Sequence, residues 1–101
     1  MMNEREQHPQ PLSAIIKERR TRLGLTQQQV AEALQVVPEA VGYWERDRRR
    51  IELDRVPHLA AVLELDQQDV CRLALYEHYP QLHATLFGAE RPPAPRPIET
   101  Q

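Results

Sequence analysis

The 101-residue chain is poor in the residues that build disulfides, sheets and aromatic cores. Its one cysteine, Cys71, excludes an internal disulfide, and a reducing cytoplasm is the simplest compartment for it. Three glycines and no long alternation of apolar with polar residues favour helices over a sheet. With 5% aromatic residues, the core must be mainly aliphatic. No apolar run is long enough for a signal peptide or a membrane span, so no membrane partner is expected.

Signatures of enzymes and metal proteins are also lacking. The chain has no nucleophile, base and acid at a recognisable spacing and no glycine-rich phosphate loop, so we predict neither catalysis nor a cofactor. A structural zinc site requires four closely spaced ligands, whereas Cys71, His78 and His83 are scattered around Pro80. We therefore predict no metal site and interpret Cys71 as a packing residue.

The net charge of −2 is unevenly distributed along the chain. Residues 13–55 contain nine basic and seven acidic side chains, whereas the remainder contains four and eight. Four of the basic residues form a cluster at 46, 48, 49 and 50. This distribution predicts a basic surface in the first half of the chain, suited to phosphate groups.

Helical periodicity predicts an all-α domain over residues 12–88 between two polar ends. A first helix is expected over residues 12–23, closed by Gly24 in a left-handed conformation. Residues 1–11 are interpreted as a flexible N-terminal arm. Residues 89–101 contain four prolines and few apolar side chains, which predicts a disordered tail.

The second helix has a well-specified beginning. Thr26 and Gln29 have the spacing of a capping box, in which each side chain bonds to the other residue's backbone amide. Val30, Ala31 and Leu34 then form an apolar stripe, so this face is expected to be buried.

Three more helices and a final short one follow. Pro38 suits the first turn of the third helix, because its missing N–H has no partner there. The fourth helix is expected to begin with Asp54 as its N-cap and to end at about Glu64. The fifth is expected over residues 66–79, and residues 81–87 are expected to form a turn or short sixth helix.

Residues 12–65 resemble the helix-turn-helix domain of the phage repressor/Cro-like (XRE) family. The resemblance is carried by Arg20, Gly24, Leu25, Thr26, Gln27, Val30, Ala31, Leu34, Val36, Val41, Trp44 and Glu45, followed by Leu59 and Ala60. It implies a compact five-helix repressor-like domain in which the third helix enters the DNA major groove and the second contacts the backbone. Two turn glycines common in the family are replaced here by Gln35 and Asp47.

The resemblance implies a set of residues that contact double-stranded DNA. These are Thr26, Gln27, Gln28, Val37, Pro38, Glu39, Ala40, Gly42, Tyr43, Arg46, Arg48 and Arg49. The amide of Gln27, with free backbone N–H groups beside it, can hold a phosphate. Glu39 can accept from cytosine or simply favour the positive helix N-terminus, and Tyr43 can bind DNA or pack.

Two further residues are assigned to the interior. Arg20 and Glu45 occupy positions that form an ion pair in the family, which locks the first helix to the third. Trp44 shares an apolar stripe with Val41, so we interpret it as a core residue rather than a base-stacking one.

The function implied is sequence-specific transcription regulation by a repressor or autoregulator that binds a palindromic operator as a homodimer. The dimer interface is expected at Leu75, Tyr76, Tyr79, Leu82, Leu86 and Phe87. Two alternatives stay open, and both involve a possible protein partner. One is a DNA-binding antitoxin of a toxin–antitoxin pair, and the other is an interaction module that kept the fold without strong DNA binding.

Overall fold

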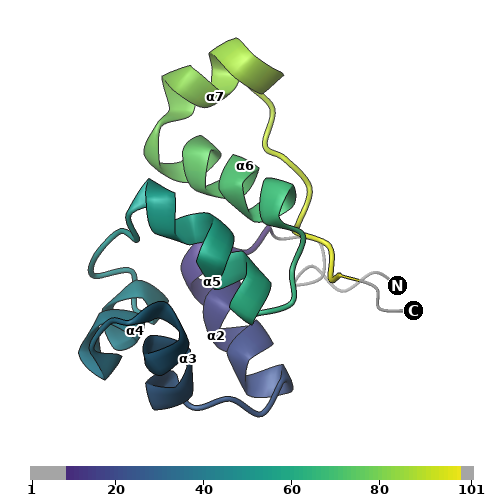
Figure 1. The fold of residues 1–101 in the computed structure, drawn as a ribbon. Coiled ribbons are helices and arrows are strands. Elements are labelled where there is room, and N and C mark those ends of the chain that lie inside the picture. Colours follow the sequence, from purple (N-terminus) through teal and green to yellow (C-terminus); the bar gives the residue numbers. More distant parts are fainter. Residues whose placement is uncertain (1–8, 99–101) are drawn as a thin grey trace, which may run out of the picture.

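The computed structural model describes residues 9–98, which fold into six α-helices and one short 3-10 helix (Figure 1). The helices are α2 (Leu12–Arg22), α3 (Gln27–Leu34), α4 (Pro38–Glu45), η1 (Leu53–Arg55), α5 (Val56–Val62), α6 (Gln67–His78) and α7 (Pro80–Phe87). The predicted all-α fold is confirmed, and most of the predicted N-terminal arm lies outside the described residues. Within the described range, every helix is too short or too polar to cross a membrane.

The start of α2 is fastened to α6. Pro11 occupies the N-cap position and supplies no side-chain cap. The backbone amide of Leu12 donates instead to the Glu77 carboxylate at 2.9 Å. At the other end of the helix, Gly24 has a φ of +75°, as expected for a glycine that follows a helix.

The capping box of α3 is formed as the sequence predicts. The Thr26 hydroxyl accepts from the Gln29 amide at 3.0 Å, and the Gln29 side chain accepts from the Thr26 amide at 2.8 Å. Two of the amides that a helix N-terminus leaves unpaired are thereby satisfied, which fixes where α3 begins.

Three non-glycine residues have a left-handed backbone: Gln35, Asp47 and Glu64, with φ values of 60°, 57° and 57°. Gln35 and Asp47 hold the positions where the family glycines are missing. At the first of them the backbone still turns as a glycine would, and the Val36 amide donates to the Ala31 carbonyl at 2.9 Å. The turn geometry is therefore kept, at a conformational cost of about 1–2 kcal/mol per residue.

The prediction for the fourth helix was wrong about its beginning. Residues 53–55 form η1, α5 spans only residues 56–62, and Asp54 makes no side-chain cap. The partly buried Leu53 packs against the core and Asp54 is exposed. The chain therefore turns once more before Pro57, which lies in the first turn of α5, where no amide is needed.

Two arginine side chains cap helix C-termini by donating hydrogen bonds to carbonyl groups there. Arg55 donates to the Leu34 carbonyl at the end of α3 at 3.0 Å. Arg19 donates to the carbonyls of Leu63 and Glu64 after α5, at 2.8 Å and 3.2 Å. Helix C-termini carry partial negative charge, so these two guanidinium groups serve the fold rather than a partner.

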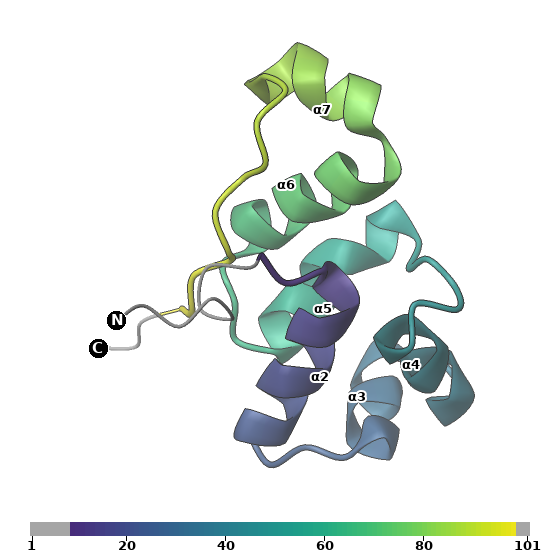
Figure 2. The same ribbon diagram turned by 180° about the vertical axis from the view of Figure 1, so that it is seen from behind.

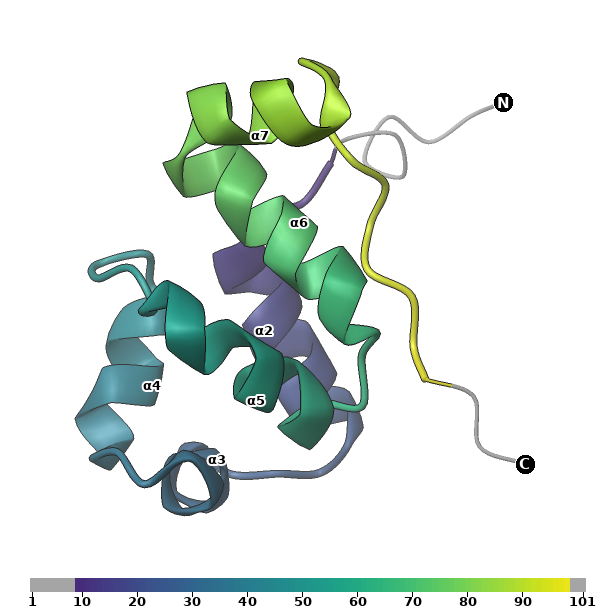
Figure 3. The same ribbon diagram turned by 45° about the horizontal axis from the view of Figure 1, so that its top comes forward.

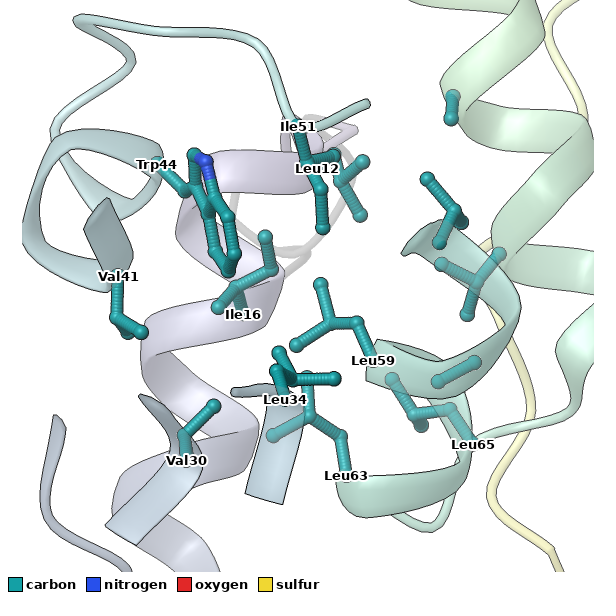
Figure 4. Close-up of a cluster of buried hydrophobic side chains, with 14 of the residues drawn as sticks. Leu12, Ile16, Val30, Leu34, Val41, Trp44, Ile51, Leu59, Leu63 and Leu65 are labelled. Carbon is teal, nitrogen blue, oxygen red and sulfur yellow. The ribbon is translucent and has the colours of Figure 1, made fainter. Parts of the chain in front are cut away.

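The core lies between α2, α5 and the α3–α4 pair and continues to α6 (Figure 4). Trp44 is 7% exposed and points toward Ile16, so it is a core residue as the sequence predicts. The buried hydrophobic residues are Leu12, Ile16, Val30, Ala31, Leu34, Val41, Trp44, Ile51, Val56, Leu59, Ala60, Leu63, Leu65, Val70, Leu73 and Ala74. This aliphatic cluster holds α3 and α4 on the rest of the domain.

A single residue joins α6 to α7. Tyr79, with φ −139° and ψ 65°, ends α6 and precedes α7, and Pro80 is the first residue of α7. The final helix thus begins one residue before the expected range of 81–87. It packs chiefly against α6 and stands at one end of the molecule, as Figures 1 and 3 show.

Residues 89–98, which we call the C-terminal strap, run beside α6 to the turn between α5 and α6 (Figure 2). The Asp66 amide donates to the Arg96 carbonyl and the Ile98 amide to the Glu64 carbonyl, both at 2.8 Å. For residues 89–98 this corrects the expected disordered tail, because these non-local bonds hold the segment although it buries few side chains. Residues 99–101 lie outside the described range.

Candidate nucleic-acid interface

The candidate interface is built on α3 and α4, which are joined by the short turn at residues 35–37. In Figure 3, α3 is seen almost along its axis whereas α4 runs across the view, so the two helices cross steeply. Val30, Leu34 and Val41 are buried between the pair and the domain. The sides of α3 and α4 that face away from these residues lie at the surface, where both helices can contact the same partner.

A buried ion pair locks α4 to α2. Arg20 Nε donates to Glu45 Oε2 at 2.6 Å and Arg20 Nη2 donates to Glu45 Oε1 at 3.0 Å. The two side chains are 13% and 3% exposed, and the third arm of the guanidinium donates to the Leu25 carbonyl at 2.9 Å. The hydrogen bond with Glu45 raises the pKa of Arg20, so the guanidinium stays charged. These are the two residues that the family resemblance pairs.

Gln27, the first residue of α3, adds a third helix to this lock. Its side-chain amide donates to Glu45 Oε1 at 3.0 Å instead of lying free on the helix surface. The backbone amides of Gln27 and Gln28 lie in the first turn and have no hydrogen-bond partner within residues 9–98. The groups at this helix end that can hold a phosphate are therefore these backbone amides and the exposed Gln28 side chain, with Thr26 beside them.

The first turn of α4 is the open part of its surface. Val37 is 63% exposed, and Pro38 and Glu39 are exposed beside it. Ala40 is half-buried and packs against the core, so it offers only an edge. This turn can present apolar surface to a thymine methyl and one carboxylate to a base or to the helix N-terminus.

Gly42 lies beneath other side chains. It is buried, and a Cβ at this position would lie 3.2 Å from Arg46 Nη1 and 3.6 Å from Gln27 Oε1. The space above Gly42, which the family resemblance assigns to DNA contact, is thus taken up by Arg46 and Gln27 of the same chain. Glycine at this position lets the Arg46 guanidinium fold down over α4.

Arginines gather around Tyr43 at the end of α4. The guanidinium carbons of Arg46 and Arg49 lie 5.5 Å and 5.0 Å from the centre of the Tyr43 ring. Together with Arg48 they line an open hollow of about 510 Å³. Arg46, Arg48, Arg49 and the neighbouring Arg50 are exposed and form no ion pair within the described residues. Exposed guanidinium groups without an acidic partner are suited to phosphate oxygens.

A model of the helix-turn-helix family matches residues 16–66, which span most of α2, all of α3 to α5 and the turn that follows. The chain belongs to this helix-turn-helix family. It is also similar to the crystal structure of the clp gene regulator ClgR from Corynebacterium glutamicum, with 25% sequence identity and a TM-score of 0.56 over 74% of this chain and 78% of that chain. No curated protein matches it. The family match includes both α3 and α4, and it supports a DNA-binding transcription regulator.

Outside this helix-turn-helix unit, the residues expected at a dimer interface divide into two groups. Tyr79, Leu82, Leu86 and Phe87 are between 46% and 57% exposed, whereas Leu75 and Tyr76 are half-buried. The first four form a largely apolar surface over α7. No acidic or basic side chain other than a histidine lies in α7, so this surface carries little charge.

Sequence reasoning missed the residue that seats α7 on α6. His83 is fully buried, its ring lies 5.2 Å from the rings of both Tyr76 and Phe87, and Arg72 donates to its Nε2 at 3.3 Å. The four-residue spacing from His83 to Phe87 was the available signal, because it puts both rings on one side of a helix.

Proposed function

We propose that this helix-turn-helix protein is a repressor or autoregulator that binds a palindromic operator as a homodimer. The observation that supports this best is the α3–α4 unit, held rigid by Arg20, Glu45 and Gln27 and followed by four exposed arginines. A rigid unit can set a helix in the major groove, and the arginines can hold the phosphates beside it.

Base readout from this unit depends on few groups. The open first turn of α4 offers Val37, Pro38 and Glu39, and the end of the helix offers Tyr43 and Arg46. An arginine in the major groove recognises guanine, and apolar side chains recognise the thymine methyl. We expect each half-site to be short, so that specificity requires two copies of the domain.

The second copy is expected at α7. Tyr79, Leu82, Leu86 and Phe87 leave apolar surface exposed on a helix that packs chiefly against α6. A surface without charge is complementary to another such surface, and a two-fold axis brings the same helix of a second chain against it. Occupying the operator is then sufficient to block a promoter.

Selection of bound duplexes from a random pool tests this function. We expect enrichment of an inverted repeat whose half-sites lie about one helical turn, or about 10 base pairs, apart. A full-length Arg46→Ala, Arg49→Ala variant that keeps its helical circular dichroism spectrum should enrich nothing. A single unrepeated motif would contradict the dimer, and a wild-type chain that enriches no motif and binds random DNA without salt dependence would contradict DNA recognition itself.

A further inference from the structure

The direction of α7 is weakly determined by its connection to α6. Tyr79 alone separates the two helices, so rotation about its backbone bonds can swing α7 as a unit. Hinges are commonly made of a few such residues at the ends of elements. Something further is therefore required to hold α7 in one orientation.

The seat of His83 on α6 supplies one point of attachment. The ring is buried against Tyr76 and Phe87, and its Nε2 accepts from Arg72. Its Nδ1 is buried without a hydrogen-bond partner in the described part of the chain. The Arg72 guanidinium also lies 4.8 Å from the centre of the Phe87 ring, so this seat holds the inner side of α7 on α6.

The C-terminal strap supplies a second point. Near α7, Arg91 donates to the Gln10 carbonyl at 2.6 Å and lies 3.5 Å from the Glu77 carboxylate, and Pro92 is buried. Glu77 in turn holds the first amide of α2. This end of the strap is thus joined to the body of the domain only a few residues after α7 ends.

The far end of the strap is fastened to the start of α6 by Arg96. Its side chain donates to both oxygens of Asp69, at 2.8 Å and 3.2 Å, and its backbone amide donates to the same carboxylate at 3.0 Å. These bonds lower the pKa of Asp69, so the clasp is charged at neutral pH. The prolines at 92, 93 and 95 restrict the backbone between the two fastenings.

We propose that the C-terminal strap is a brace that sets the direction of α7, and that Arg96 is the positioning residue that fastens it. The hinge at Tyr79, the seat of His83 and the strap together hold α7 at three separate places. This inference deepens the proposed function and rests on it in one respect: if α7 is the dimer contact, its direction sets the separation of the two α4 helices and hence the half-site spacing that the dimer accepts.

Distances within one chain test the brace without reference to DNA or to dimers. Spin labels are placed at Glu18→Cys on α2 and Thr85→Cys on the polar side of α7, in a Cys71→Ser background and diluted with unlabelled protein. We expect a narrow distance distribution in the parent and in the matched control Glu90→Gln, an exposed residue of the same strap. Arg96→Asp, which faces Asp66 and Asp69, should broaden the distribution to about twice its width or more, with unchanged helical content.

Arg96→Lys should give an intermediate width, because it keeps the charge but loses the paired donors. Equal widths in the parent and in a helical Arg96→Asp variant would overturn the brace.

A second experiment measures the affinity for selected operators whose spacer is altered by one base pair. The parent should bind the original operator about tenfold more tightly than the altered ones. The Arg96→Asp variant should show a much smaller difference, since a mobile α7 allows several separations of the two α4 helices. Failure to bind any DNA would contradict the proposed function, whereas unchanged discrimination in Arg96→Asp would contradict the role of the brace in setting the spacing.

Discussion

The carboxamide of Gln27 donates to the carboxylate of Glu45 at 3.0 Å and so joins the first residue of α3 to the last residue of α4. The same carboxylate holds the Arg20 guanidinium of α2 by two further bonds. One buried carboxylate therefore fixes the relative positions of three helices. It also explains why the α4 surface can be sparse in polar groups and still be presented to a partner at a defined angle.

Removing this carboxylate should destabilise the domain strongly. Glu45→Ala leaves Arg20 buried without its partner, which costs about 3 kcal/mol and lowers the Tm by more than about 10 °C in a domain of this size. Thermal unfolding followed by circular dichroism measures the effect. Glu52→Ala is the matched control, because Glu52 is 77% exposed in its pair with Arg55 and should change stability by less than about 1 kcal/mol. Equal melting curves for Glu45→Ala and the parent would refute the lock.

Replacing Gln35 by glycine should stabilise the protein. Gln35 has a φ of 60°, a conformation that costs an L-residue about 1–2 kcal/mol and glycine little. Glycine also gives the unfolded chain more conformational freedom, which offsets part of this gain. We therefore expect Gln35→Gly to raise the free energy of unfolding by about 0.5–1 kcal/mol. Gln28→Gly, at an exposed helical position of the same helix, should instead lower it by up to about 1 kcal/mol. Denaturant unfolding of both variants gives the comparison.

Arg49 should contribute to DNA binding without contributing to its specificity. Its guanidinium lies at the surface over the Tyr43 ring, and we assign it to phosphate contact. Arg49→Ala should weaken binding to operator and random duplexes by a similar factor and reduce the salt slope by about one. Arg49→Lys keeps the charge and should keep the slope. A changed base preference in Arg49→Ala would mean that this side chain reads bases.

Two charges placed on the apolar side of α7 should separate the dimer. The double variant Leu82→Glu, Leu86→Glu replaces two leucines that are 48% and 57% exposed by carboxylates. Because neither position is buried, the fold should be kept. Light scattering should then give a monomer with an unchanged circular dichroism spectrum and weak, salt-sensitive DNA binding. Gln81→Glu with Thr85→Glu has the same spacing on the polar side and should remain a dimer. A helical dimer of the first variant would place the interface elsewhere.

Local signals made most of the helices predictable. Thr26 with Gln29 marked the start of α3, Pro38 marked the start of α4, and Gly24 marked the end of α2, because caps and first turns depend on residues within four positions of each other. Asp54 showed the limit of this approach. It has the chemistry of an N-cap, but the burial of its neighbour Leu53 determined the turn instead.

Long-range contacts could not be predicted in the same way. The strap has few apolar residues and many prolines, so its composition indicated disorder. In the structure, Arg96 contacts Asp69 and the α5–α6 turn, which are far away in the sequence. The same applies to the candidate interface. The type and position of Gln27 were informative, but the direction of its side chain depends on Glu45, which another helix supplies.

Hydroxyl-radical footprinting of the full chain on a selected duplex tests the central claim, that α3 and α4 of two copies bind DNA as a two-fold pair. We predict two equal protected segments on one face of the duplex, centred about one helical turn apart. Both should be lost together when Leu82 and Leu86 are replaced by glutamate. A single protected segment, or two whose protection survives in that variant, would contradict the account.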